Sequence, residues 1–310
     1  MYNLADKRIW VAGHNGMVGA AVCRALASEN CEILTAPRAE LDLLRQSDVD
    51  DWCAQEKPDA VIVCAARVGG ILANDTYPAD FIYQNLTLET NIIHSAYKAE
   101  VEKLIFLGSS CIYPKHAAQP IKEDALLTGP LEASNECYAI AKIAGIKLCQ
   151  AYRKQYGCDF ISAMPTNLYG PGDNFDLETS HVVPALLRKA HEAKLENAGD
   201  MQVWGDGTPL RELLYADDCA AGIIFLLKNY SDHDHVNLGS DEEISIADLA
   251  QLICDTVGFS GELQFDTSRP GGTPRKKLNT EKMTNMGWRA QTKLNVGLEL
   301  ALQDMIARYF

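Results

Sequence analysis

Short apolar runs alternate with longer segments of helical periodicity along the first half of the chain. Strands that alternate with helices in this way predict βαβ units, in which helices cover both faces of a parallel sheet. The pattern therefore predicts an α/β protein with a doubly wound parallel sheet. The expected strands are "RIWVAG" at 8–13, "CEILTA" at 31–36, "AVIVCAA" at 60–66, "KLIFLGSS" at 103–110 and "FISAMPTNL" at 160–168, and the expected helices span 16–29, 46–56, 79–99 and 135–156.

The alternation becomes irregular after residue 170. "YGPGDNFD" at 169–176 has the composition of a loop, and "MQVWGDGTPLRELLYADD" at 201–218 predicts a strand, a turn and a second strand. We therefore expect a smaller C-terminal lobe that is interleaved with the last strands of the sheet. The other expected elements are helices at 180–193, 216–228, 246–257 and from about 296, and a short strand at 235–239.

Composition and charge narrow the choice of function. The net charge of −14 and the lack of a basic cluster longer than "PRKK" at 274–277 argue against a nucleic-acid surface. The apolar runs are far shorter than the roughly 20 residues that span a bilayer. The ten cysteines include no C-x-x-C pair, and several lie inside apolar segments. Free thiols and a cytoplasmic location are therefore expected, with no membrane partner.

A glycine motif follows the first expected strand. "VAGHNGMVGAAV" places Gly13, Gly16 and Gly19 at the start of the first helix. Glycines there let the backbone approach a pyrophosphate, whose charge is stabilised by the free N–H groups of the helix. The position in a βαβ unit therefore predicts a dinucleotide site.

The end of the second strand indicates which dinucleotide binds. "ILTAPRAELDL" has no carboxylate directly after the strand, where an NAD site usually places one for the ribose 2′-hydroxyl. Arg38 follows instead, and a guanidinium can pair with a 2′-phosphate. NADPH is therefore favoured over NADH, with a solvated surface arginine as the alternative.

Three residues predict acid/base chemistry on a substrate oxygen. "YAIAK" places Tyr138 and Lys142 four residues apart on one helix face, and Ser109 stands at the end of the fourth strand. A neighbouring ammonium is expected to lower the pKa of the phenol from about 10, which would make Tyr138 a proton donor near neutral pH. Ser109 can share the same substrate oxygen.

Eight segments together resemble the extended short-chain dehydrogenase/reductase family, in its branch of GDP-sugar epimerase/reductases. The resemblance implies a homodimer with a Rossmann-type cofactor domain. It also implies NADPH-dependent conversion of GDP-4-keto-6-deoxy-D-mannose to GDP-L-fucose, by epimerisation at C3 and C5 followed by reduction of the C4 ketone. The segments are "GHNGMVG", "NDTYPADFIYQN", "GSSCIYP", "YAIAKIAGIKLC", "MPTNLYGPGDNF", "SHVVPALLRK", "VWGDGTPLRE" and "GGTPRK".

The resemblance assigns lobes and residue roles. The NADP-binding domain is expected at 1–174 plus 211–240, and the GDP-sugar lobe at 175–210 plus 241–310. The catalytic residues are Ser109, Cys111, Tyr138, Lys142 and His181, in which Cys111 and His181 form the acid/base pair. The cofactor residues are Gly13, Asn15, Gly16, Met17, Val18, Gly19, Arg38, Leu107, Gly108, Lys142, Pro165, Asn167, Leu168 and His181, and the substrate residues are Lys189, Trp204 and Arg211.

The chain departs from the family pattern at three positions. Lys189 stands where relatives have an arginine, Gly271 where they have an aspartate, and Asn15 where some have a basic residue. These departures bear on affinity rather than on the type of reaction. No metal is expected, because no other His or Cys stands at ligand spacing from Cys111.

Other functions remain possible from the sequence. The same residues could serve an epimerase or reductase of another GDP-4-keto sugar, such as a deoxyheptose or a dideoxyhexose. A protein that binds NADPH without turnover is a more remote alternative. A 4,6-dehydratase is disfavoured, because that class usually carries an Asp-Glu pair where this chain has Ser110 and Cys111.

Overall fold

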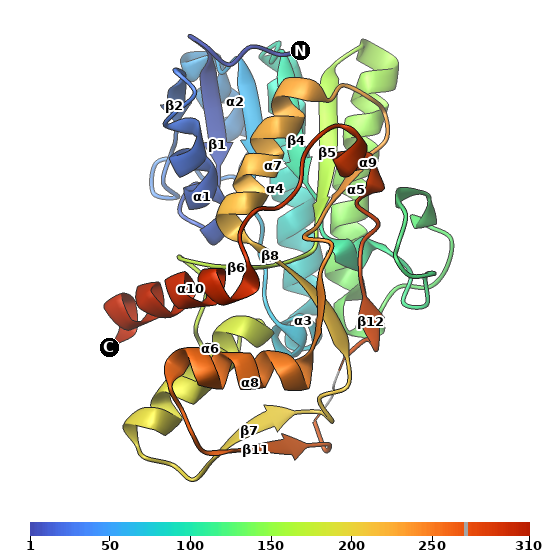
Figure 1. Cartoon of the computed structure of the whole chain (residues 1–310). Coiled ribbons are helices and arrows are strands. Elements are labelled where there is room, and N and C mark those ends of the chain that lie inside the picture. Colours follow the sequence, from blue (N-terminus) through green and yellow to red (C-terminus); the bar gives the residue numbers. More distant parts are fainter. Residues whose placement is uncertain (270–271) are drawn as a thin grey trace.

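A computed structural model describes residues 1–269 and 272–310, which fold around a six-stranded sheet (Figure 1). The strand order is β2-β1-β3-β4-β5-β9, and all neighbouring strands run parallel. Strands β1, β3 and β4 are almost wholly buried, as expected for a parallel sheet covered on both faces. The bounds are β1 Arg8–Ala12, β2 Glu32–Leu34, β3 Ala60–Val63, β4 Lys103–Leu107, β5 Asp159–Pro165 and β9 Val236–Leu238.

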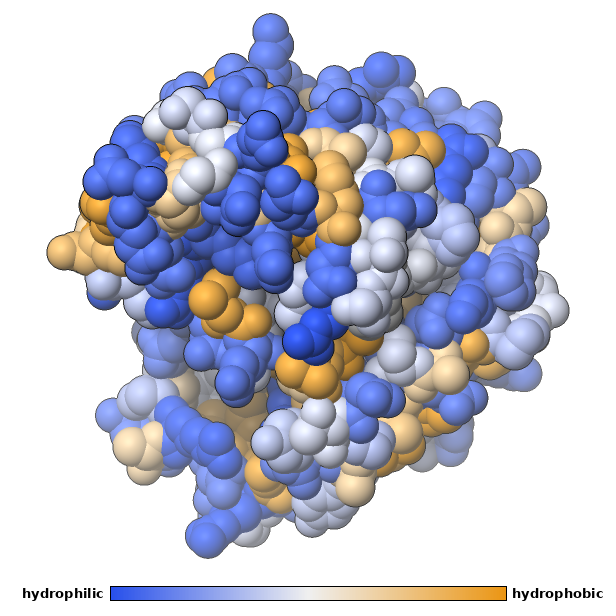
Figure 2. Space-filling view, turned by 90° about the horizontal axis from the view of Figure 1, so that it is seen from below, coloured by the Kyte–Doolittle hydropathy of each residue, from blue (hydrophilic) through white to orange (hydrophobic). Residues whose placement is uncertain are grey.

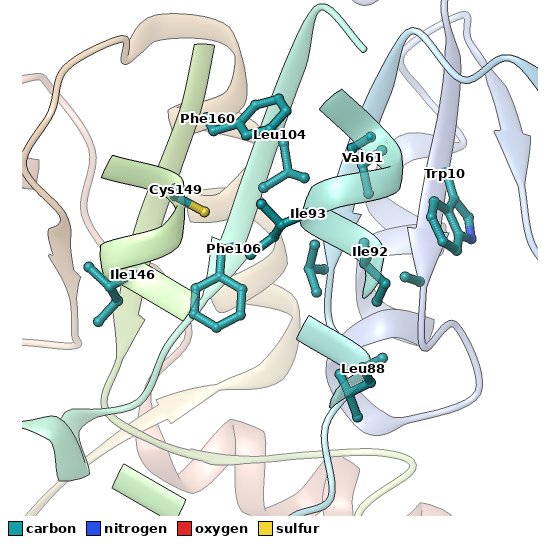
Figure 3. Close-up of a cluster of buried hydrophobic side chains, with 14 of the residues drawn as sticks. Trp10, Val61, Leu88, Ile92, Ile93, Leu104, Phe106, Ile146, Cys149 and Phe160 are labelled. Carbon is teal, nitrogen blue, oxygen red and sulfur yellow. The ribbon is translucent and has the colours of Figure 1, made fainter. Parts of the chain in front are cut away.

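Helices cover both faces of this sheet, each over its own apolar cluster. Figure 3 shows one cluster, in which Ile93 of α4 and Ile146 of α5 lie against Phe106 of β4. The other cluster joins Val22 of α1 and Ile223 of α7 to the opposite face. The predicted doubly wound α/β fold is therefore confirmed. The helices are α1 Met17–Leu26 and α7 Ala216–Asn229 on one face, and α2 Gln46–Glu56, α4 Pro78–Lys98 and α5 Glu136–Tyr156 on the other.

Strand β1 has β2 on one side and β3 on the other, so the order of the strands reverses at this point. Ligands of open α/β sheets bind beyond the carboxyl ends of the strands at such a reversal. Gly13 follows β1, and Ser109 follows β4 at the same edge. The fold thus collects the predicted residues along one edge of the sheet.

The smaller lobe has a separate core below this edge (Figure 1). It contains α6 Val182–Leu195, α8 Ile246–Val257 and α10 Leu294–Tyr309, together with the parallel pair β7 Asp200–Trp204 and β11 Glu262–Asp266. Seen from below, this end of the molecule is mostly hydrophilic, with apolar residues in scattered patches (Figure 2).

A third sheet connects the two lobes. Strand β8, Leu210–Tyr215, pairs with three short strands that come from different parts of the chain. These are β6 Asn167–Tyr169, β10 Glu243–Ser245 and β12 Arg275–Lys276. The remaining elements are helices α3 Ile71–Thr76 and α9 Glu281–Asn285, and the 3₁₀ turns η1 Ser110–Ile112, η2 Glu123–Ala125 and η3 Ala133–Asn135.

Most predicted elements are present within a few residues of their expected bounds. The two strands expected within 201–218 form, but β7 pairs with β11, and β8 pairs with β6, β10 and β12, so the two do not pair with each other. The sequence did not predict β10, β11, β12, α3 or α9. The expected lobe boundaries stay a prediction. Among the described residues, no helix combines the length and apolar character needed to cross a membrane.

Candidate active site

A cavity of about 700 Å³ lies between the carboxyl edge of the sheet and the smaller lobe. Both lobes contribute side chains to its wall, so a ligand in it would contact the predicted catalytic and substrate residues together. The predicted residues that line it are Ser109, Cys111, Tyr138, Asn167, Leu168, His181, Lys189, Trp204 and Arg211.

The glycine loop leaves room for close approach of a ligand to the backbone. Gly13 has a φ of +90°, and a Cβ there would lie 2.6 Å from the backbone nitrogen of Ala65. A Cβ on Gly19 would overlap the carbonyl oxygen of Gly13. Gly16 is the N-cap of α1 and supplies no capping side chain, so the N–H groups of the first turn, which starts at Met17, are free to bind an anion. The loop therefore fits a dinucleotide pyrophosphate. The predicted residues Asn15 and Val18 lie in the same turn.

Arg38 lies beyond the carboxyl end of β2, which pairs with β1, the strand that leads into the glycine loop. Its side chain is exposed, and no hydrogen bond or ion pair within the described residues involves it. The positions between the strand and Arg38 hold Thr35, Ala36 and Pro37, none of which is acidic. This arrangement fits a 2′-phosphate better than a free ribose hydroxyl.

The ends of β4 and β5 complete the expected cofactor wall. The Gly108 backbone nitrogen donates to the Ala163 carbonyl oxygen at 2.9 Å, and Met164 occupies the space that a Cβ on Gly108 would need. Leu107 and Pro165 are buried beside it, and Leu168 follows in β6. The Asn167 amide donates to the Glu212 carbonyl oxygen at 3.1 Å, which fixes the side chain at the cavity wall.

Ser109 and Tyr138 meet in the cavity, as the sequence predicts. Burial raises the pKa of the Tyr138 phenol well above 10, and a hydrogen bond with Ser109 opposes this shift only weakly. Ser109 also accepts a hydrogen bond from the Cys111 backbone nitrogen at 3.4 Å, which anchors the 3₁₀ turn that carries Cys111. Tyr138 is therefore fully protonated at neutral pH and is ready to donate.

Lys142 lies behind Tyr138 and is paired with a buried carboxylate that the sequence analysis did not identify. Its Nζ is 2.7 Å from Oε1 of Glu89, and the two side chains are 2% and 1% exposed. The Lys142 ammonium is farther from Tyr138, at 5.9 Å from the ring centroid. The expectation that Lys142 brings the pKa of Tyr138 toward neutrality is therefore wrong for this arrangement, because burial has the largest effect on this pKa and the neighbouring Cys111 and Glu89 also raise it.

Cys111 is 5% exposed, and burial raises the pKa of its thiol above 9. The nearby ammonium groups of Lys276 and Lys142 oppose this shift in the pKa by favouring the thiolate. Lys276 lines the same cavity, and its ammonium makes no hydrogen bond or ion pair within residues 1–269 and 272–310. The resting cysteine is a protonated thiol, and a positive charge is available to stabilise its anion.

His181 is the N-cap of α6 and faces the cavity from the opposite lobe. Its ring is exposed to the cavity, yet the surrounding protein removes enough bulk water to lower its pKa below 6.5. At neutral pH the imidazole is therefore uncharged and can accept a proton. Together, Cys111 and His181 hold one transferable proton, which is the requirement for an acid/base pair.

The predicted substrate residues gather in the smaller lobe. The Trp204 ring is 38% exposed and lies near two cations, with Lys189 Nζ and the Arg269 guanidinium each 5.2 Å from its centroid. Arg211 is held from β8 by bonds to the carbonyl oxygens of Leu210 and Thr273, at 2.8 and 2.6 Å. This group of cations and one aromatic ring suits a nucleoside diphosphate. Gly271 lies outside the described residues.

The sequence gives little indication that Glu89 and Lys276 belong to the site. Glu89 interrupts the buried apolar face of α4, where its neighbours Leu88 and Ile92 are core residues. Lys276 stands both in the basic cluster "PRKK" and at the end of the family-like segment "GGTPRK", but neither pattern indicates that its side chain lies beside Cys111. Within residues 1–269 and 272–310, no group of three or more His, Cys, Asp or Glu side chains is placed to hold a metal ion.

Comparisons with known proteins agree with this geometry. A model described as the NAD dependent epimerase/dehydratase family matches residues 9–239. A GDP-L-fucose synthase from Sinorhizobium fredii is 62% identical over 99% of this chain and 98% of its own length. The GDP-L-fucose synthase of Escherichia coli K12 is 50% identical over 97% of each chain. A solved GDP-L-fucose synthetase from Naegleria fowleri bound to NADP is 30% identical, with a TM-score of 0.90 over 98% of this chain and 95% of its own.

Proposed function

The chain belongs to the NAD dependent epimerase/dehydratase family, among relatives that are GDP-L-fucose synthases, and from this premise we propose that it makes GDP-L-fucose. Its substrate is GDP-4-keto-6-deoxy-D-mannose, and its reductant is NADPH. The enzyme first epimerises C3 and C5 and then reduces the C4 ketone. The observation that carries this proposal is the single cavity in which Ser109, Tyr138, Cys111 and His181 meet.

Epimerisation depends on the ketone. The hydrogens on C3 and C5 are acidic because each carbon is next to the C4 carbonyl. Removal of either proton leaves an enolate, whose oxygen accepts hydrogen bonds from Ser109 and Tyr138. Cys111 and His181 approach the cavity from different lobes. One of them removes the proton, and the other returns a proton to the opposite face of the carbon.

Reduction uses the same oxygen-binding residues. Bound NADPH supplies the hydride that adds to C4. Tyr138 donates its phenolic proton to the oxygen as charge develops there, so ketone, hydride and proton together give the new hydroxyl group. Lys142 stabilises the resulting phenolate from behind the ring until the proton is replaced. The same tyrosine therefore serves both stages.

Cofactor use tests the proposal directly. Purified enzyme given NADPH and GDP-4-keto-6-deoxy-D-mannose should oxidise one NADPH for each sugar consumed and yield GDP-L-fucose, identified by NMR. Tyr138→Phe removes the proton donor and should slow the reduction by about 10²- to 10⁴-fold. Loss of NADPH absorbance without formation of GDP-L-fucose would show reduction without epimerisation and would contradict the epimerase part of the proposal. No oxidation of NADPH at any enzyme concentration would refute the proposal.

The enzyme is further proposed to act as a homodimer in the cytoplasm. The adjacent helices α4 and α5 carry large apolar side chains that are exposed in the single chain, among them Tyr83 at 67% and Tyr156 at 49%. All ten cysteines are free thiols, which fits a reducing compartment. Light scattering should give twice the chain mass of 34.1 kDa, and a value of one chain mass would contradict the dimer.

A further inference from the structure

Three polar atoms in the wall of the catalytic cavity are buried without a hydrogen-bond partner among the described residues. They are Oδ1 of Asn74, Oδ1 of Asn135 and Oγ of Ser180. All three residues line the same cavity as Tyr138 and His181. Buried polar atoms without partners are rare because each loses its bonds to water on burial. Three in one wall indicate a ligand that supplies the missing partners.

The amide of Asn74 is oriented by the backbone beside it. Its nitrogen donates to the carbonyl oxygens of Gly69 and Gly70, at 2.7 and 3.0 Å. The side chain is 7% exposed, and with both donors used only Oδ1 remains available. This orientation fixes Asn74 as an acceptor that requires a donor from the ligand.

Asn135 occupies a position where its side chain would ordinarily serve the helix. It is the N-cap of α5, a position that asparagine favours because its oxygen can accept from the first free N–H groups. No such capping bond is formed here. The oxygen is left without a partner, and Tyr138 follows three residues later. Asn135 therefore offers a second acceptor next to the proton donor of the reaction.

Ser180 brings the third atom close to the acid/base pair. It precedes His181, and the neighbouring Thr179 carbonyl oxygen accepts from the Gly70 nitrogen at 2.9 Å. That bond ties the start of α3, which carries Asn74, to the segment that carries Ser180. The three atoms thus belong to residues that line one cavity together with the predicted acid/base residues Tyr138 and His181.

We propose that Asn74, Asn135 and Ser180 form a hydroxyl-reading subsite that selects GDP-4-keto sugars with free hydroxyl groups at C2 and C3. This inference rests on the function proposed above. The hexose ring of that substrate carries hydroxyl groups on these two carbons, and each can donate to an asparagine oxygen while Ser180 completes the bonding. A 2-deoxy or 3-deoxy sugar leaves one buried acceptor unpaired. Such a sugar is rejected even though it fits the cavity by size.

The test compares kcat/KM for GDP-4-keto-6-deoxy-D-mannose with kcat/KM for its 2-deoxy and 3-deoxy analogues. Wild-type enzyme should prefer the hydroxylated sugar over at least one analogue by about 10- to 100-fold, the effect of one unpaired buried acceptor. Asn135→Ala should lower kcat/KM for the hydroxylated sugar but not for the analogue that lacks its hydroxyl partner, so the ratio of the two values should approach one. The KM for NADPH should stay unchanged. Asn74→Ala should have the same effect with the analogue that lacks the hydroxyl group bound by Asn74.

Two further variants separate recognition from folding. The Asn135 side chain makes no hydrogen bond within the described residues, so Asn135→Ala should unfold at the wild-type temperature. Asn135→Asp keeps an acceptor oxygen and should retain most of the discrimination. The control is Asn229→Ala, which removes an exposed asparagine bonded only to the Phe225 carbonyl oxygen and should leave every ratio unchanged.

The outcomes are distinct. Equal wild-type kcat/KM for all three sugars would overturn the subsite and leave the proposed function intact. An equal loss by the asparagine variants on all three sugars would also overturn it, because the residues would then be structural. Failure of wild-type enzyme to turn over the hydroxylated sugar would refute the proposed function, and the subsite with it.

Discussion

Lys142 and Glu89 form an ion pair of 2.7 Å in the interior, beside Tyr138, the proposed proton donor. Burial raises the pKa of Glu89 to about 7, and the Lys142 charge opposes that shift. Lys142 also lies 4.7 Å from the centroid of the Phe106 ring, which limits where the ammonium can move. The position and the counter-charge of Lys142, which is proposed to support Tyr138, are therefore set by one carboxylate on α4.

Replacement of Glu89 should impair the reduction. Glu89→Gln keeps the shape of the side chain but removes the charge that holds Lys142, so kcat should fall by about 10- to 100-fold, as expected when a catalytic group is misplaced. The KM for the GDP-sugar should change little, because Glu89 does not line the cavity. Steady-state kinetics check this. Glu29→Gln is the control, since Glu29 pairs with Lys228 at a partly exposed site, and an equal loss of kcat there would contradict the account.

The same carboxylate should make stability depend on pH. The pKa of Glu89 is raised from 4.5 to about 7 on folding, so the folded protein binds a proton that the unfolded chain releases in this range. The contribution of Glu89 to stability is therefore present below about pH 4.5 and is lost as the pH rises to about 7. Urea unfolding of wild type and Glu89→Gln should show their difference changing in this direction. A constant difference would argue against a buried titrating Glu89.

Cys111 should be required for exchange at the carbons next to the ketone. Cys111→Ser replaces the thiol with a much weaker acid, so deuterium uptake from solvent at C3 and C5 should slow by about 10²- to 10⁴-fold. The Kd for NADPH should stay within about twofold, because Cys111 is proposed to transfer protons at the sugar and is not among the proposed cofactor residues. Cys149→Ser changes another buried free thiol, outside the cavity, and serves as the control. Normal exchange in Cys111→Ser would remove this residue from the mechanism.

Arg38 should select between the two nicotinamide cofactors. Arg38→Ala removes the guanidinium expected to bind the 2′-phosphate, so the Kd for NADPH should rise by about 10- to 100-fold while the Kd for NADH changes little. Fluorescence titration measures both constants. Arg45→Ala is the matched control, because Arg45 is an exposed arginine farther along the same loop. Equal weakening of the two cofactors by Arg38→Ala would make Arg38 a solvated surface residue.

Local sequence pattern predicts the large sheet well, for a physical reason. Strands β3 and β4 are buried on both faces, so they appear as continuous apolar runs such as "AVIV" and "KLIFL". The smaller lobe is different. Strand β11 is mostly exposed, and its partner β7 lies about 60 residues earlier in the chain. Pairing between distant, half-exposed strands leaves no local pattern, so β11 was not predicted.

The site divides in the same way. Ser109, Cys111, Tyr138 and His181 stand in recognisable motifs, and they do meet in one cavity. Glu89 was missed because a carboxylate in an amphipathic helix is ordinarily expected on the solvent face. Asn135 was missed because its N-cap position already explains an asparagine. Both residues become informative only when burial and hydrogen-bond partners are known.

Isotope placement in the product tests the central claim that one cavity performs both reactions. The enzyme is given GDP-4-keto-6-deoxy-D-mannose and NADPH in D₂O, and the product is examined by proton NMR. The account predicts GDP-L-fucose with deuterium at C3 and C5, taken from solvent through the Cys111 and His181 pair, and with protium at C4 from NADPH. A reduced sugar that retains protium at C3 and C5 and the original configuration would contradict it.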